Sequence, residues 1–348
     1  MRAWEYDGHG VALVERPALV PGPGQVVLDV TAAGLCHSDL TLTGRPADSH
    51  PFPLPLVLGH EVAGTVREVG GGVTGVAVGD PVVVHGPWGC GECRRCRAGE
   101  ENLCPRAARE RIFPVGLGAD GGLAEQVLVP SSRHLVRADG IAPEQAAPLT
   151  DAGLTAFTAV RLSRDAMVEG ATVVVLGIGG LGHLALQLVK HLTPARVVAF
   201  DVSAAARELA AGLGADVVLD PTVAPVAAEV RALTGEDGAD VVLDFVASER
   251  TLADAVACLA PGGELSVVGV GAATVPVAVK TMPLGSTVRT PYWGSRGDLD
   301  EVLELSRRGV LSVHTNTFSL DEAHRAYELM RTGGLVGRAV VLPARESW

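Results

Sequence analysis

The chain has 348 residues, enough for two domains of ordinary size, and its apolar (47%) and charged (20%) fractions exclude a disordered protein. The net charge of −12 argues against binding to nucleic acid, because phosphate groups are bound by basic surfaces. No uninterrupted apolar run reaches the ~18–20 residues of a membrane span, and the first residues do not resemble a signal peptide. We therefore expect a cytoplasmic protein without nucleic-acid or membrane partners.

The N-terminal third contains short apolar segments separated by glycine and proline. Strands are expected at Gln25–Val30, Gly64–Val69 and Val82–Val84. Short strands at this close spacing predict an irregular barrel or sandwich. A helix is expected to begin near Pro143, because proline suits the first helical turn, and to run toward Arg161.

From Ala171 to Val270 the pattern changes to continuous apolar strands that alternate with amphipathic helices. Such strands predict a parallel sheet covered by helices on both faces. Strands are expected at Thr172–Leu176, Arg196–Asp201, Val217–Leu219, Ala239–Val246 and Glu264–Val270, and helices at Gly180–Leu192, Ala204–Ala211, Ala224–Leu233 and Thr251–Leu259. Two helices, Leu299–Arg308 and Asp321–Arg331, and the strand Arg338–Leu342 are expected near the C-terminus.

The fold class is therefore α/β, with a β-rich domain predicted at residues 1–150 and a doubly wound parallel sheet at residues 151–287. No long linker separates the parts, so we expect residues 288–348 to return to the first domain.

A glycine-rich turn follows the strand Thr172–Leu176 and opens a helix. Its sequence is Gly177-Ile178-Gly179-Gly180-Leu181-Gly182. In dinucleotide-binding proteins the first glycine of this pattern makes a tight turn, the second lets the backbone approach a pyrophosphate, and the third lets the helix lie against the sheet. The helix N-terminus adds N–H donors for the phosphates. The pattern alone is weak evidence, since a glycine-rich turn can lack a ligand, but both flanking elements match.

The acidic residue Asp201 ends the next predicted strand. In this position a carboxylate accepts hydrogen bonds from the adenosine ribose and repels a 2′-phosphate. The following Val202-Ser203-Ala204 offers no arginine to offset that repulsion. NAD is therefore the expected coenzyme, rather than NADP.

Four of the six cysteines lie within fifteen residues, in the pattern Cys90-x2-Cys93-x2-Cys96-x7-Cys104. Four thiolates make a closed tetrahedral structural zinc site, and Arg94, Arg95 and Arg97 are expected to offset its negative charge. Chance clustering and a nucleic-acid zinc ribbon are the alternatives, and the acidic chain argues against the ribbon. Cys258 is expected in the core.

A catalytic zinc needs three protein ligands and one open position. Cys36 and His60 both follow apolar segments of the strand-rich domain and are candidate ligands. Each of them, taken alone, is more often a core residue than a ligand. Asp151 belongs to no local metal motif, and a helix-interior Asp that caps a turn or meets solvent explains it equally well.

The segment Gly59-His60-Glu61-x2-Gly64-x5-Gly70-x2-Val73 resembles the zinc signature of medium-chain alcohol dehydrogenases. Nearly the whole chain follows that family, which implies a GroES-like catalytic domain, a Rossmann domain and a substrate cleft between them. Leu149-Thr150-Asp151-Ala152-Gly153 is similar to the bacterial NAD-dependent secondary alcohol dehydrogenases, which use Asp where liver-type enzymes have a second cysteine. This resemblance implies Asp151 as the third ligand of the catalytic zinc. If Asp151 is not a ligand, Glu61 is the next candidate.

The same resemblance implies further roles, residue by residue. Ser38 would take the alcohol proton, Asp39 would orient His60, and Glu61 would approach the zinc in the resting enzyme. His37 and Arg338 would face the coenzyme pyrophosphate, and Thr155 the nicotinamide. The substrate pocket would be lined by Thr41, Leu117, Tyr292 and Trp293.

These features predict an NAD-dependent alcohol dehydrogenase with two zinc ions per subunit, acting on small-molecule alcohols and ketones as a homodimer or homotetramer. The mostly apolar pocket favours secondary alcohols over sugars. A polyol or threonine dehydrogenase would keep the same zinc ligands and remains the alternative. A zinc-free quinone or enone reductase would lack both ligand sets, and a non-catalytic zinc-binding protein would not need Cys36, His60, Ser38 and Asp151 together.

Overall fold

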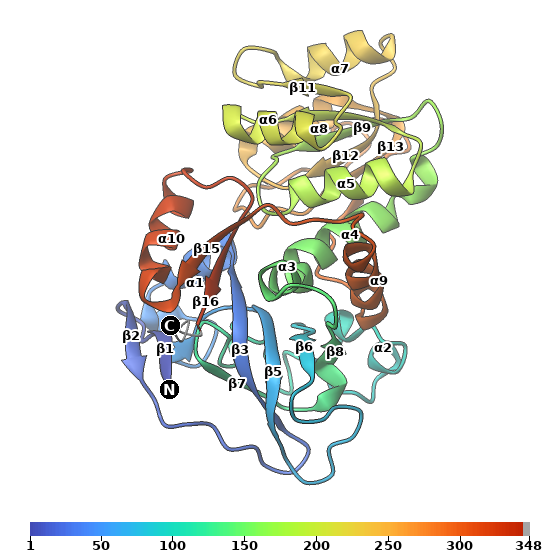
Figure 1. The fold of residues 1–348 in the computed structure, drawn as a ribbon. Helices are drawn as coiled ribbons and strands as arrows, with labels where there is room; N and C mark the ends of the chain where they lie inside the picture. Colours follow the sequence, from blue (N-terminus) through green and yellow to red (C-terminus); the bar gives the residue numbers. More distant parts are fainter. Residues whose placement is uncertain (344–348) are drawn as a thin grey trace. The chain divides into compact units, whose positions relative to one another are not determined.

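The computed structural model describes residues 1–343, and the chain divides into two compact units (Figure 1). The first unit contains Met1–Leu154 and the chain from Trp293 onward, and the second contains Thr155–Tyr292. Among the described residues, no helix is long and apolar enough to cross a membrane.

The first unit is organised around the long strand β3 (Val26–Leu35), which pairs antiparallel with three other strands. These partners are β5 (Glu61–Val69), β7 (Gln126–Val129) and the C-terminal β16 (Arg338–Leu342). The larger sheet is completed by β6 (Pro81–Val84), β8 (Leu135–Arg137) and β15 (Thr315–Ser319). A small second sheet contains β1 (Arg2–Tyr6), β2 (Val11–Glu15) and β4 (Leu56–Val57).

Helices from distant parts of the chain complete the first unit. Its α-helices are α1 (His37–Thr43), α2 (Arg94–Arg97), α3 (Pro143–Pro148), α9 (Arg296–Arg307) and α10 (Ala323–Arg331). Single 3-10 turns lie at Ala47–Ser49, Glu101–Leu103, Ser132–His134 and Leu320–Glu322. Helix α10 buries Ala326, Tyr327 and Met330 in the same core as β3. The Trp4 indole in β1 donates to the carbonyl of Leu320 (2.6 Å), so both ends of the chain contribute to this core.

The single helix predicted from Pro143 to Arg161 is interrupted. Helix α3 is followed by the π-helical turn Leu149–Gly153 and then by α4 (Leu154–Leu162). Pro148 has no N–H to donate within a helix, which disturbs the regular bonding there. In the wider turn the N–H of Ala152 points instead to Oε1 of Glu61, at 2.9 Å. Such turns often occur at functional sites.

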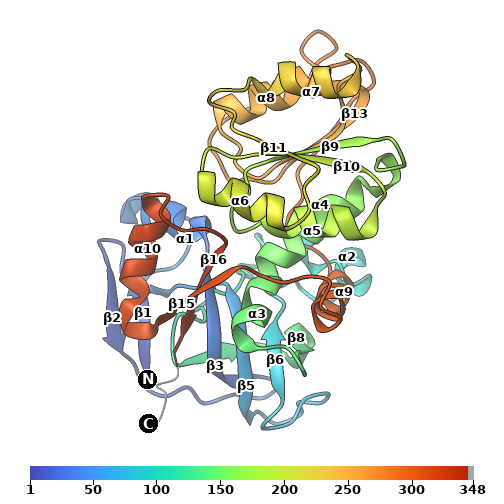
Figure 2. The same cartoon turned by 45° about the horizontal axis from the view of Figure 1, so that its top comes forward.

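The second unit contains a six-stranded parallel sheet in the order β11-β10-β9-β12-β13-β14. Helices α5 and α6 lie on one side of this sheet and α7 and α8 on the other (Figure 2). The strands are β9 (Thr172–Leu176), β10 (Arg196–Phe200), β11 (Val217–Leu219), β12 (Ala239–Asp244), β13 (Leu259–Val267) and β14 (Thr287–Arg289). The helices are α5 (Gly182–Leu192), α6 (Ala204–Gly212), α7 (Val226–Thr234) and α8 (Glu249–Cys258), with a 3-10 turn at Arg164–Ala166.

The predicted doubly wound α/β sheet is thus confirmed, but the structure adds the edge strand β14, which was not predicted, and shifts several element ends. Strand β13 begins at Leu259 rather than Glu264, because Leu259 already pairs with Ala239 before the register shifts. The core of this sheet is apolar on both faces, and every residue of β9 is buried. Cys258 is fully buried in that core, as expected.

Truncation of a large side chain in this core should lower the free energy of unfolding. Phe200 is among the largest fully buried side chains, and Phe200→Ala should lower the free energy of unfolding by about 3–5 kcal/mol. Val223→Ala, a truncation at a side chain that is 81% exposed, is the control and should have little effect. Thermal unfolding of both variants checks this, and equal midpoints would contradict the assigned core.

Candidate active site and metal centres

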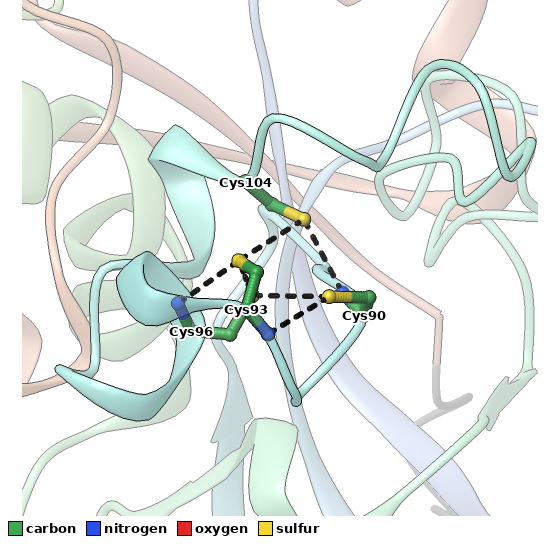
Figure 3. Close-up of side chains that lie close together, drawn as sticks. All are labelled: Cys90, Cys93, Cys96 and Cys104. Carbon is green, nitrogen blue, oxygen red and sulfur yellow. Dashed lines mark hydrogen bonds between the residues drawn. The ribbon is translucent and has the colours of Figure 1, made fainter.

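The four clustered cysteines converge in the loop around α2 (Figure 3). The Sγ atom of Cys93 lies 3.4 Å from that of Cys96 and 3.9 Å from that of Cys104, and the Sγ atoms of Cys90 and Cys96 are 3.9 Å apart. Four sulfur atoms about 2.3 Å from one zinc ion, at the corners of a tetrahedron, would be about 3.8 Å apart. The cluster therefore fits a closed zinc site.

Backbone N–H groups prepare these thiols for a metal. The N–H of Cys93 donates to Sγ of Cys90, and the N–H of Cys96 donates to Sγ of Cys93. Hydrogen bonds from Glu92 and Cys93 lower the pKa of the Cys90 thiol to about 7, which favours the thiolate form that binds metal.

The loop is held by contacts that the sequence pattern did not reveal. Arg133 donates to the carbonyl of Gly89 (2.7 Å) and to Glu101 (3.0 Å), while Glu101 accepts the N–H of Gly89 (2.7 Å). A side chain at Gly89 would collide with Sγ of Cys96, 2.6 Å from the added carbon. Of the arginines predicted to offset the thiolates, Arg95 pairs with Glu100 (2.7 Å).

The second metal-ligand group combines three residues that are far apart in sequence. Cys36 directly follows β3 as the N-cap of α1, His60 directly precedes β5, and Asp151 lies in the π-helical turn. The Oδ2 atom of Asp151 is 3.4 Å from Nε2 of His60 and 3.9 Å from Sγ of Cys36. Tetrahedral zinc ligands would place such atoms about 3.4 and 3.6 Å apart. Thiolate, imidazole and carboxylate are all zinc ligands, so the group fits a site with three protein ligands and an open position.

Asp39 contacts two of these three residues, His60 and Cys36. Its Oδ1 atom lies 3.2 Å from Nδ1 of His60, and its Oδ2 accepts the N–H of Cys36 (3.0 Å). With Nδ1 turned to Asp39, the Nε2 atom of His60 faces Asp151 and Cys36 and is the ring nitrogen that would bind a metal ion. Burial lowers the pKa of His60, but the charge of Asp39 and hydrogen bonds to Asp151 and Asp39 outweigh it and raise the pKa.

Glu61 and Arg338 form a buried ion pair beside the same group. Arg338 donates to both carboxylate oxygens of Glu61, at 2.9 and 2.6 Å, and its Nη2 is 3.7 Å from Oδ2 of Asp151. Burial raises the pKa of Glu61 to about 7 despite the opposing charge of Arg338. The Glu61 carboxyl group occupies the place where Gly34 would carry a side chain, so only glycine fits there. In this arrangement Glu61 is held by Arg338 and belongs to neither metal-ligand group found among residues 1–343.

The remaining predicted residues of the first unit lie on or near these elements. The Oγ atom of Ser38 is 3.6 Å from Sγ of Cys36, whereas His37 is exposed at the start of α1. The Trp293 ring is buried and meets His60 edge-on, with 6.0 Å between centroids. Exposed Thr41 donates to the carbonyl of His37 (3.1 Å), and Leu117 packs against the core.

Thr155 and Tyr292 belong to the second unit, where Thr155 is buried and Tyr292 is 49% exposed.

The glycine-rich turn has the geometry that its sequence predicts. Gly177 has a φ of +86°, which favours glycine, and the helix begins at Gly182. A side chain at Gly182 would collide with the carbonyl of Gly177, whereas a side chain at Gly179 would meet open space. The turn therefore leaves the backbone around Gly179 and Gly180 accessible before α5 begins, and Leu181 is the N-cap residue.

Asp201 is fixed between this turn and helix α6. One carboxylate oxygen accepts the N–H of Ile178 (2.7 Å) and the other accepts the N–H of Ser203 (2.7 Å). Asp201 and Gly177 both line a cavity of about 200 Å³ at the carboxyl ends of the parallel strands, the edge at which such sheets bind nucleotides. The other lining residues are Leu176, Phe200, Val202, Pro221, Val226, Val246, Ser248, Arg250, Thr251 and Asp254.

Comparison with known proteins identifies the family. A model described as the alcohol dehydrogenase GroES-like domain matches residues 22–140, and a model of zinc-binding dehydrogenases matches residues 180–308. The chain is 35% identical to a protein of Sulfurisphaera tokodaii named NAD-dependent alcohol dehydrogenase, over 97% of each chain. It is 34% identical to D-arabinose 1-dehydrogenase (NADP(+)) of Saccharolobus solfataricus, over 93% of this chain and 91% of that one.

The solved structure of an alcohol dehydrogenase from Aeropyrum pernix matches with a TM-score of 0.90 and 34% identity, covering 99% of this chain and 100% of that one. The chain belongs to the zinc-dependent medium-chain alcohol dehydrogenase family. The predicted combination of a GroES-like domain and a Rossmann-type sheet is confirmed.

The closed cysteine cluster predicts a stability defect when one ligand is lost. Cys93→Ser should lose one of two zinc ions and several kcal/mol of stability, lowering the unfolding midpoint by about 10 °C or more. Elemental analysis and thermal unfolding measure both effects. A variant as stable as the parent would show that the loop is not structural.

Asp151→Ala is the matched variant in the second metal group. It should also lose one zinc ion, because Cys36 and His60 alone hold the metal weakly, but the cysteine loop and the coenzyme cavity are untouched. We expect near-parental NADH binding with turnover reduced by on the order of 10³-fold or more. Full zinc content with near-parental turnover would contradict Asp151 as a ligand.

Proposed function

We propose that this protein is an NAD-dependent oxidoreductase that interconverts hydrophobic, mainly secondary alcohols and the corresponding ketones or aldehydes, with a catalytic zinc at Cys36, His60 and Asp151. The observation that carries the proposal is the tetrahedral spacing of these three ligand atoms with the Ser38 hydroxyl beside them. The glycine turn with Asp201 supports the coenzyme, and the coenzyme named for the Sulfurisphaera relative agrees.

A zinc ion in such a site polarises the substrate oxygen, and NAD carries the hydride. The chain's own residues supply position and a route for the proton. We assign to Ser38 the proton of the alcohol hydroxyl, because its Oγ lies beside Cys36. Asp39 orients His60 through Nδ1, and Arg338 holds the Glu61 carboxylate with two hydrogen bonds.

The coenzyme contacts remain proposals. The pyrophosphate would be bound by the glycine-rich turn, and the adenosine ribose by Asp201. The residues of the turn are Gly177, Gly179, Gly180, Leu181 and Gly182. We also propose that His37 faces the pyrophosphate and Thr155 the nicotinamide. The sequence predicts that Arg338 faces the pyrophosphate. Its two hydrogen bonds to Glu61 instead favour a role in stabilising the region around the metal ligands.

The preference for hydrophobic substrates is supported by Trp293, whose ring contacts His60 edge-on. Thr41, Leu117 and Tyr292 complete the proposed pocket. A second candidate, a sugar or polyol dehydrogenase, is favoured by the D-arabinose 1-dehydrogenase relative. A threonine dehydrogenase would use the same ligands.

We also propose that the protein is cytoplasmic and forms a homodimer or homotetramer. Its proposed domains are residues 1–150, 151–287 and 288–348.

A substrate screen distinguishes these candidates. A polyol hydroxyl that enters an apolar pocket without a partner costs about 1–3 kcal/mol, which corresponds to roughly 5- to 150-fold in kcat/KM. NADH formation should therefore be at least about ten-fold more efficient with 1-phenylethanol or 2-pentanol than with D-arabinose, sorbitol or threonine. Asp151→Ala serves as the control for contaminating enzymes. A preference for arabinose, sorbitol or threonine would contradict the secondary-alcohol proposal.

A further inference from the structure

The loop that carries Asp201 has an arginine beside it, although the three residues that follow Asp201 include none. This arginine is Arg207. Nη1 of Arg207, in α6, donates to the carbonyl of Asp201 (2.8 Å) and to that of Val202 (2.9 Å). Val202 is 68% exposed and lines the same cavity as Asp201. The guanidinium group of Arg207 is therefore held by hydrogen bonds against the backbone of the loop that we expect to contact the coenzyme ribose.

The charge of this arginine is balanced by Asp220. Strands β10 and β11 are neighbours, so Asp220 follows β11 where Asp201 follows β10. Oδ2 of Asp220 is 3.0 Å from Nη1 of Arg207, and its Oδ1 accepts the N–H (2.9 Å) and the hydroxyl (2.6 Å) of Thr222. These hydrogen bonds, together with the charge of Arg207, lower the pKa of Asp220, so its carboxylate is ionised at neutral pH.

We propose that Asp220 is a specificity-determining residue for the coenzyme: by neutralising and anchoring Arg207, it leaves the Asp201 carboxylate as the uncompensated charge of this loop, so that NADPH is rejected. The inference rests on the proposed role of Asp201 at the ribose. Without the Arg207 charge the local sum would be two negative charges, and without the Asp220 charge it would be zero.

Direct electrostatics therefore predicts opposite effects of two substitutions. A 2′-phosphate carries up to two negative charges, and its binding responds to the local sum far more than binding of a ribose hydroxyl does. Both side chains are about three-quarters covered, at 24% and 22% exposure, so solvent screening is incomplete. Arg207 and Asp220 lie behind the cavity wall, and the arginine that lines the cavity is Arg250, which donates to the carbonyl of Pro221 and lies 3.7 Å from Asp254. Neither substitution changes these groups.

The test measures dissociation constants of NADH and NADPH by fluorescence titration of the zinc-loaded protein. Asp220→Asn keeps an acceptor for Thr222 and should tighten NADPH binding by about five- to tenfold while changing NADH binding less than about threefold. Arg207→Met should shift the ratio of the two constants in the opposite direction. Asp29→Asn, which removes an arginine-paired carboxylate from the other unit, is the charge-matched control and should leave the ratio unchanged.

Parallel weakening of both coenzymes in both variants would mean that the pair is only structural and would overturn the inference. So would an NADPH gain in Asp220→Asn that persists in the double variant Asp220→Asn/Arg207→Met. The proposed function fails separately: if the parent protein binds neither coenzyme, or if Asp201→Ala leaves the NADH/NADPH ratio unchanged, then the ribose assignment falls and the inference with it. A parent that discriminates through Asp201 but does not respond to Asp220→Asn or Arg207→Met leaves the proposed function intact and overturns the inference alone.

Discussion

The first unit depends on keeping several acidic groups together out of water. Cys36, Asp39, Glu61 and Asp151 all have side chains within one buried or half-buried region. Uncompensated burial of such groups would be strongly unfavourable. Arg338 compensates two of them directly, since it donates to Glu61 and lies 3.7 Å from Asp151, and a metal ion would compensate Cys36 and Asp151. Strand β5, strand β16 and the π-helical turn each contribute one member of this network, namely Glu61, Arg338 and Asp151.

The two metal centres show two ways of making a site. The four ligands of the cysteine loop lie within fifteen neighbouring residues, and Arg133 is an added contact from outside that holds the loop. The Cys36, His60 and Asp151 group has to be brought together by β3, β5 and the helical segment after α3. Local assembly suits a site that stabilises the fold, whereas assembly from several rigid elements gives the fixed geometry that a reaction needs.

The predictability of these features follows the same division. The glycine turn, the cysteine loop and five of the six parallel strands have signals within a few residues, and the sequence predicted them; the short edge strand β14 was missed. Predicting Asp151 as a ligand required a family resemblance, because the π-helical turn depends on Pro148 and on the Glu61 carboxylate, which is 91 residues from its partner Ala152. The clamp of Arg133 on Gly89 and the pairing of Arg207 with Asp220 join separate elements and leave no periodic pattern in the sequence. Burial on α10 and the nearby charge of Asp39 raise the pKa of Tyr327, which is another coupling between separate elements.

The position of β16 in the chain affects the order in which the protein can fold during synthesis. Residues 155–292, with all six strands of the parallel sheet, emerge from the ribosome before the strand that contains Arg338. Domains generally fold as units, from the N-terminal end first. Here the second unit has its whole sequence available first, while β3 still lacks its partner β16 and Glu61 lacks its cation. The group of Cys36, His60 and Asp151 therefore gains its contact with Arg338 only after the whole second unit has been synthesised.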